Sequence, residues 1–165
     1  MNTEPITDEQ IERLASDLTE LWSIGGTLKD VYGFTPEECE AVYTLGYNLY
    51  NQGKFLDALK AFGFLLMHDH LERRYYKSFA SALQMLKRYE EAIKHYSIAS
   101  MLDLSDPEPT FHTGECMVGI GMIEEAKEAF DLVVRQTEKK EAYAVMHEQA
   151  KALLALLEKR EEATS

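Results

Sequence analysis

The chain repeats its small residues at a fixed interval. Three alanines, Ala58, Ala92 and Ala126, stand 34 residues apart in the segments GKFLDALKAF, KRYEEAIKHY and GMIEEAKEAF. Each segment has a large apolar or aromatic residue three positions before its alanine and an aromatic residue four positions after it. Twelve positions before each alanine stands another small residue: Gly46, Ala80 or Gly114. Because small residues let two helices approach closely, this spacing predicts an all-α chain built from pairs of helices.

The pattern resembles the tetratricopeptide repeat over residues 39–137. The resemblance implies a solenoid of three helix pairs, in which each pair buries its apolar face against the next one. The sequence departs from the family in two ways: no tryptophan begins the first helix, and His70 and Leu104 stand where a proline often ends the unit. Neither departure disturbs the alternation of small and large residues. We therefore expect the solenoid to occupy residues 36–137.

The residues before the repeats predict an N-terminal helical arm over residues 1–35. The segment GGTLKDVYG breaks the chain after an amphipathic helix, and TPEE at Thr35–Glu38 has the pattern of a capping box that starts the next helix. The arm either folds back on the solenoid or pairs with another chain. For the second case, the candidate dimerisation residues are Leu14, Leu18, Leu21 and Trp22.

Residues 138–165 predict a C-terminal capping helix and tail. The terminal unit of a solenoid needs a cover for its last apolar face. The apolar residues expected to form this cover are Val145, Ala152, Leu153, Leu156 and Leu157.

The charge of the chain argues against two classes of partner. With 29 acidic and 17 basic residues, the formal net charge is −12, which repels nucleic acid phosphates and anionic membranes. The sequence has no run of 18 apolar residues, and its acidic N-terminus lacks the apolar region of a secretory signal. Cys39 and Cys116 are expected to be core residues of a protein in a reducing compartment. We therefore expect a cytoplasmic protein that binds neither nucleic acid nor a membrane.

Catalytic motifs are missing from the sequence. It has no P-loop, no GxGxxG and no HExxH, so neither an enzyme nor a cofactor is expected. The segment His68-Asp69-His70 could meet a metal only if a helix ends there, because side chains two residues apart on a helix diverge. The simpler interpretation is that these histidines cap helix carbonyls, and no metal site is predicted.

The first helix of the first repeat has two apolar faces. Winding residues 42–50 at 100° per residue gives one stripe that is expected to pack the solenoid: Val42, Leu45, Gly46 and Leu49. A second stripe, about a quarter turn away, contains Tyr43, Tyr47 and Tyr50.

The resemblance suggests a use for the second stripe. In tetratricopeptide proteins the first helices line a concave groove, and the groove-facing positions are commonly 2, 5, 9, 12 and 13 when the repeat alanine is position 20. On this numbering the predicted peptide-binding residues, with the adjacent His112, are Tyr43, Tyr47, Tyr50, Asn51, Lys77, Ser81, Gln84, Phe111, His112 and Glu115. The same positions also include Glu40, Arg74, Met85, Glu108, Val118 and Gly119.

Two alternatives bear on this groove. Tyr43 and Tyr47 stand where relatives that bind acidic C-terminal tails have lysine and asparagine, so that ligand class is disfavoured. The tyrosines could instead be ordinary core, covered by the chain's own arm or capping helix. The sequence leaves open which of the two, a client or the chain itself, covers this stripe.

A closer resemblance extends over residues 26–137. The segments GGTLKDVYGFTPEECEAVYTLGYNLYNQGKFLDALKAFGFLL and FHTGEC are similar to those of class II chaperones of bacterial type III secretion. Those chaperones bind translocators, the hydrophobic pore subunits, and often dimerise through their N-terminal region. The resemblance implies a cytoplasmic chaperone that holds an extended translocator segment in its groove and keeps it soluble. The alternative is a tetratricopeptide scaffold or regulatory adaptor, including one with a transcriptional co-regulator role.

Overall fold

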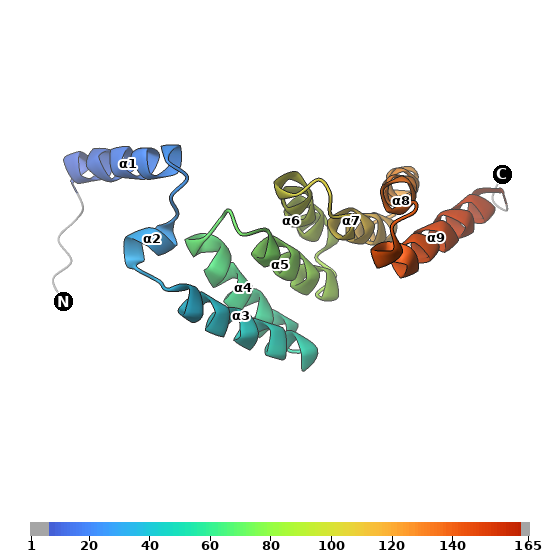
Figure 1. The fold of residues 1–165 in the computed structure, drawn as a ribbon, viewed down its shortest axis with the longest axis horizontal. Helices are drawn as coiled ribbons and strands as arrows, with labels where there is room; N and C mark the ends of the chain where they lie inside the picture. Colours follow the sequence, from blue (N-terminus) through green and yellow to red (C-terminus); the bar gives the residue numbers. More distant parts are fainter. Residues whose placement is uncertain (1–6, 163–165) are drawn as a thin grey trace.

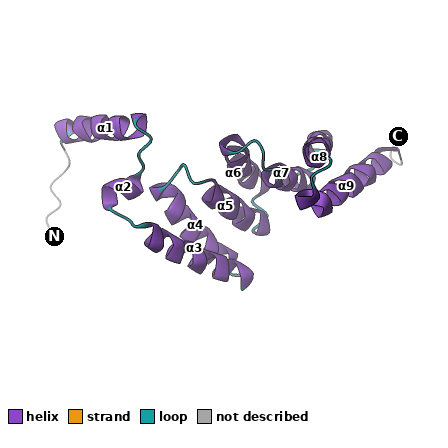
Figure 2. Ribbon diagram, in the orientation of Figure 1, coloured by secondary structure: helices purple, strands orange, loops and turns teal. Residues whose placement is uncertain are grey.

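The computed structural model describes residues 7–162, apart from the side chains at positions 8, 10, 11, 14, 18, 22 and 160–162. Over these residues the chain is helical, with short connecting loops and no strand (Figure 2). The helices are α1 (Asp8–Ser23), α2 (Leu28–Tyr32), α3 (Pro36–Asn51), α4 (Phe55–His68), α5 (Arg73–Met85), α6 (Tyr89–Leu102), α7 (Glu108–Gly119), α8 (Ile123–Thr137) and α9 (Ala144–Glu162), with a 3₁₀ turn η1 (Glu141–Tyr143) before α9. The predicted all-α class is confirmed.

The helices from α3 to α8 form three successive pairs. Each helix packs on the next along the chain, α3 on α4 through to α8 on α9, so the pairs stack in a row (Figure 1). Helix α3 begins at the predicted capping box, in which the Thr35 hydroxyl accepts from Glu38 N at 3.2 Å and Glu38 accepts from Thr35 N at 2.9 Å. The three predicted helix pairs are therefore present, as α3–α4, α5–α6 and α7–α8.

The repeated small residues sit where two helices come closest. A Cβ atom added at Gly46 would lie 2.7 Å from the Phe62 ring, and one added at Gly114 would lie 2.8 Å from the Phe130 ring. The three repeat alanines are fully buried: Ala58, Ala92 and Ala126. The small residue on one helix thus receives the aromatic ring of its partner, which is the packing that the 34-residue spacing predicts.

One member of the predicted packing stripe is not buried. Leu45 is 55% exposed, whereas Gly46 is buried and Val42 and Leu49 are partly buried. The residue at the same position of the second repeat, Phe79, lies against α4 of the preceding repeat, where a Cβ at Gly63 would be 3.1 Å from its ring. Leu45 belongs to the first repeat and has no preceding helix pair to cover it, so the prediction for Leu45 is wrong.

The C-terminal helix covers the third repeat with a different set of residues than expected. Ala150 and Leu157 are buried in a core cluster with Ala126, Phe130 and Val133, and Leu153 packs partly against that cluster. Of the other residues predicted to form the cover, Val145 is 74% exposed, Leu156 is 54% exposed and Ala152 is also exposed. These three residues lie roughly a third of a turn away from the buried stripe of α9, so they face solvent.

Within the N-terminal arm, α1 stands apart from the solenoid, whereas α2 contacts it. Helix α1 lies at one end of the molecule, and α2 leads from it toward α4 (Figure 1). Lys29 on α2 pairs with Asp69, which directly follows α4. Of the candidate dimerisation residues, Leu21 is half-buried, whereas the side chains of Leu14, Leu18 and Trp22 lie outside the described part of the chain. The role of this arm stays a prediction.

None of the helices in the described residues is both long and apolar enough to cross a membrane.

Candidate functional site

A pocket of about 490 Å³ opens between the first and second helix pairs. Helix α3 supplies one wall, α5 supplies the other, and Phe62 of α4 and Glu108 of α7 complete it. The full lining is Tyr43, Tyr47, Tyr50, Phe62, Glu72, Arg73, Arg74, Lys77, Ser78, Ser81 and Glu108. Its position between first helices of successive repeats matches the groove predicted from the sequence.

The wall from α3 is aromatic. The Tyr43 ring lies 5.7 Å from the Phe62 ring and 6.0 Å from the Tyr75 ring, and the Tyr50 ring contacts the Phe55 ring edge-on at 5.3 Å. These contacts orient both rings, while Tyr47 remains 54% exposed. No described residue of α1 or α9 lines the pocket. The tyrosine stripe therefore faces an open pocket, which the described parts of the arm and of the capping helix leave uncovered.

The wall from α5 carries three cations, and each is paired with a carboxylate of the chain. Arg74 lies 4.2 Å above the Tyr43 ring and donates to Glu40 at 2.8 Å. Lys77 bonds Asp106 at 3.0 Å and also Glu108, and Arg73 pairs with Asp103. Burial opposes the charged form of Lys77, but its bonds to Glu108 and Asp106 outweigh burial and raise its pKa. The pocket thus combines apolar surface with cations that are already neutralised.

A chain of polar side chains lies beside the pocket and links α5, α6 and α7. Ser81 Oγ is 2.9 Å from the Tyr96 hydroxyl, which donates to Gln84 Oε1 at 2.8 Å. Gln84 Nε2 donates to Glu115 Oε2 at 2.9 Å, and His112 Nδ1 lies 2.8 Å from the same oxygen. The His112 ring also stacks on the Tyr96 ring at 5.4 Å. Four predicted site residues therefore meet in one hydrogen-bonded group, which Tyr96 joins.

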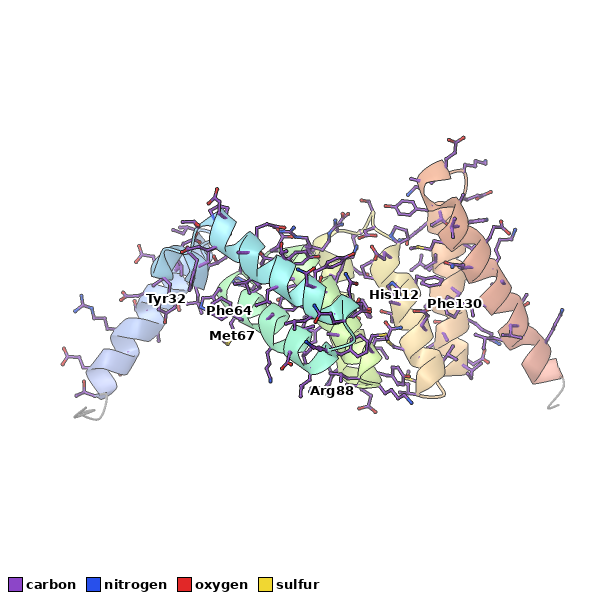
Figure 3. The ribbon with its side chains drawn as sticks, turned by 90° about the horizontal axis from the view of Figure 1, so that it is seen from below. Tyr32, Phe64, Met67, Arg88, His112 and Phe130 are labelled. Atoms are coloured by element: carbon purple, nitrogen blue, oxygen red, sulfur yellow. The ribbon has the colours of Figure 1, made fainter. Side chains whose placement is uncertain are left out.

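Two predicted site residues lie elsewhere. Asn51 is exposed at the end of α3 and does not line the pocket. Phe111 is only 6% exposed and packs edge-on against Phe130, 5.7 Å away. His112 and Phe130 lie on the neighbouring helices α7 and α8 (Figure 3). Phe111 thus belongs to the core of the third repeat, because α8 and α9 close over it.

Several residues of the site were absent from the prediction. Arg73 and Ser78 line the pocket from α5 at positions outside the usual groove set. For Tyr96 the repeat pattern predicts only a packing role, because its position in the repeat matches Phe62 and Phe130. The hydroxyl group that Tyr96 has and those phenylalanines lack is the one signal in the sequence that could have indicated its polar role.

The pair His68 and His70 shows no geometry of a metal centre. His68 Nδ1 lies 2.7 Å from the Phe64 carbonyl oxygen, and its ring sits against Phe34 and Phe64 at 4.9 and 4.2 Å. His68 therefore caps the end of α4, as the simpler interpretation of the sequence held. Among the described residues, no group of three or more His, Cys, Asp or Glu side chains could hold a metal ion.

Comparison with known proteins finds a repeat family and chaperones among the similar proteins. A family model described as tetratricopeptide repeat matches residues 39–70 and 75–106. The chaperone protein SicA of Salmonella typhimurium is 33% identical over 127 residues, which are 77% of this chain and 77% of SicA. The low calcium response locus protein H of Yersinia pestis is 32% identical over 121 residues, 71% of this chain and 72% of the relative.

Solved structures resemble the fold over most of the chain. PcrH in complex with the chaperone-binding region of PopD matches with a TM-score of 0.75 and 31% identity, over 78% of this chain and 97% of PcrH; PcrH is a protein of Pseudomonas aeruginosa. The type III secretion translocator chaperone SycD of Yersinia enterocolitica matches with a TM-score of 0.75 and 27% identity, over 79% of this chain and 98% of SycD.

Proposed function

The chain belongs to the tetratricopeptide-repeat family of type III secretion translocator chaperones, and we propose that its pocket between α3 and α5 holds an extended, apolar segment of a translocator. The single observation that carries this proposal is the open aromatic wall of Tyr43, Tyr47 and Tyr50. Relatives with the same fold have been crystallised with segments of the translocators PopD, PopB and YopD.

The chemistry of the two walls fits such a client. Tyrosine rings bury apolar side chains at low entropic cost, and their hydroxyl groups can bond a peptide backbone. The cations of α5 are already paired with carboxylates of the chain, so an acidic client side chain would have to displace one of them. The pocket therefore favours neutral, apolar side chains over acidic ones.

Binding of this kind needs no catalysis. A pore-forming client exposes membrane-seeking segments, and covering one of them in the cytoplasm of the producing cell keeps the client from aggregating before export. The ordering cost that an extended client pays on binding lowers its affinity, which keeps the complex releasable. We propose that the protein is such a holding chaperone, with no enzymatic step and no cofactor.

Co-expression with the translocators of its own secretion system tests this function. Wild-type protein should keep a translocator in the soluble fraction and co-purify with it. The double variant Tyr47→Ala/Tyr50→Ala should bind about 100-fold more weakly, since two aromatic anchors are lost. Tyr143→Ala is a matched control, because Tyr143 lies in the 3₁₀ turn η1 and does not line the pocket.

Two outcomes would contradict this function. If the double variant is folded by circular dichroism and binds the translocator as tightly as wild type, the tyrosine wall is not the client site. If no translocator is solubilised, the protein is better described as a scaffold or adaptor.

We also propose that the arm serves dimerisation through Leu14, Leu18, Leu21 and Trp22. In support, an apolar surface lies where the arm meets α4: Tyr32 of the arm and Met67 of α4 are 68% and 65% exposed and gather beside Phe64 (Figure 3). Exposed apolar patches of this kind commonly mark protein interfaces. Light scattering after removal of residues 1–24 should show the mass of a monomer, and an unchanged dimer mass would contradict this role.

A further inference from the structure

In the group of hydrogen-bonded side chains beside the pocket, Glu115 at one end determines which atom donates and which accepts in each bond. Burial alone would raise the pKa of this carboxyl, but the hydrogen bonds from His112 and Gln84 outweigh burial and hold its pKa below the usual range. A carboxylate can only accept hydrogen bonds. Gln84 must therefore turn its Nε2 toward Glu115, as the distance of 2.9 Å indicates, and its Oε1 toward Tyr96.

The orientation of Gln84 in turn determines the donors in the bonds of Tyr96 and Ser81. Because Gln84 Oε1 is an acceptor, the Tyr96 hydroxyl donates its one proton to it, at 2.8 Å. Burial raises the pKa of Tyr96 well above its ordinary value, so this hydroxyl keeps its proton. The contact of 2.9 Å between Tyr96 and Ser81 can then have only one donor, which is Ser81 Oγ.

Of these hydrogen-bonded side chains, Ser81 is the one that lines the pocket. Its proton is committed to Tyr96, so only oxygen lone pairs remain for a bound molecule. On the opposite wall the polarity is reversed, because Ser78 Oγ donates to the Tyr43 hydroxyl oxygen at 3.1 Å and leaves the Tyr43 proton for the pocket. One wall thus presents an acceptor and the other a donor.

We propose that Ser81 is a specificity-determining residue that accepts a backbone N–H of the client, and that Tyr43 donates to a client carbonyl across the pocket. This proposal rests on the proposed function and adds to it a hydrogen-bond polarity, with an acceptor for client N–H groups on one wall and a donor for client carbonyls on the other. Glu115, Gln84 and Tyr96 are positioning residues, which act on the client only through Ser81.

The test replaces client amides with esters. The probe is a synthetic peptide of the translocator segment that limited proteolysis leaves protected on the wild-type chaperone. Each backbone amide in turn is replaced by an ester, which removes the N–H and turns an oxygen lone pair toward its former acceptor. At one position the ester should weaken binding to wild type about tenfold, the effect of one lost hydrogen bond.

Two variants separate this role from a merely structural one. In Ser81→Ala the ester at that position should weaken binding by less than about twofold, because the acceptor is gone. In Tyr96→Phe the ring stays but the Ser81 proton is released, so Ser81 can turn it toward the ester oxygen and the penalty should fall to about threefold or less. The matched controls are Ser97→Ala and Tyr143→Phe. Ser97 donates to Ile93 O of its own helix, and neither residue lines the pocket.

The possible outcomes distinguish a failure of this inference from a failure of the proposed function. If the peptide binds but Ser81→Ala leaves the ester penalty unchanged at every position, Ser81 does not bond the client backbone. Only this inference is then overturned. If Tyr96→Phe is folded and retains the full ester penalty, the polarity is not set through Tyr96. If no translocator segment is protected at all, the proposed function fails first, and this inference fails with it.

Discussion

Tyr43 and Phe111 occupy the same position in the first and third repeats, yet their surroundings differ completely. Tyr43 lines the open pocket, whereas Phe111 is 6% exposed in a cluster that includes Phe130, Ala150 and Leu157. The difference comes from α9, which closes the third repeat, while no helix of the described chain covers the pocket of the first. A repeat position therefore fixes the direction of a side chain, and the neighbouring elements decide whether it meets solvent or core.

Truncation of the Tyr43 and Phe111 rings should give the largest difference between the two positions. Phe111→Ala should lower the free energy of unfolding by about 3–5 kcal/mol, as the loss of a buried phenylalanine does, whereas half-buried Tyr43→Ala should cost less than half as much. Urea denaturation measures both. Phe111→Leu, a milder control, should lose less than Phe111→Ala because it leaves a smaller cavity. Equal costs for the two alanine variants would mean that Phe111 is no more a core residue than Tyr43.

The packing under the two positions should, in contrast, be equivalent. Gly46→Ala and Gly114→Ala each push a Cβ to within 3 Å of a buried aromatic ring, of Phe62 and of Phe130. Each should cost about 1–3 kcal/mol from overpacking, reduced by the better helix propensity of alanine. Thermal or urea unfolding of the two variants should give similar losses. A loss in one repeat only would show that the first and third pairs do not share the same packing.

The turns inside the repeats give a smaller effect of opposite sign. Gly53, Lys87 and Gly121 stand 34 residues apart and all have a left-handed backbone, with φ of 74°, 59° and 82°. Only glycine adopts this conformation without steric cost, so Lys87→Gly should stabilise the protein by about 0.5–1 kcal/mol. The reverse change, Gly53→Lys, should destabilise it by a similar amount. If both changes are neutral, the turn conformation carries no strain in the second repeat.

The smallest effect concerns pH and the second repeat alone. His95 lies between Tyr76 and Phe79, where the other two repeats have Ala61 and Ala129, and its buried Nδ1 finds no hydrogen-bond partner among the described residues. Burial lowers its pKa, with Glu91 and Lys94 acting in opposite directions. The unfolded chain then binds the proton more tightly, so this contribution to stability is present above about pH 6.5 and is lost as pH falls below it.

Unfolding free energies at several pH values between 5 and 8 measure this contribution. The variant His95→Ala, which restores the residue type of the other repeats, should lose stability less steeply than wild type toward low pH. Identical pH dependence in the two proteins would mean that His95 titrates as it does in the unfolded chain.

Much of the candidate site could be predicted from the repeat register. The register placed Tyr43, Tyr47 and Tyr50 on one face of α3, and the structure brings these three to one wall of the pocket. It could not show that Phe111 is buried, because burial depends on α9, whose contacts are not part of the repeat. It also could not reveal the role of Tyr96, since a hydrogen bond to Ser81 and Gln84 needs three side chains from two helices to meet.

The sequence by itself determined the helix pairs and their close approach. Small and aromatic residues recur every 34 positions, and their sizes alone dictate which helix faces can pack, because a ring such as Phe62 fits only where its partner is as small as Gly46. The tertiary structure decided which faces stay open and which way the hydrogen bonds of the pocket run. Exposure at Leu45, burial at Phe111 and the polarity of Ser81 each depend on elements distant in the chain, and no local pattern of residues encodes such contacts.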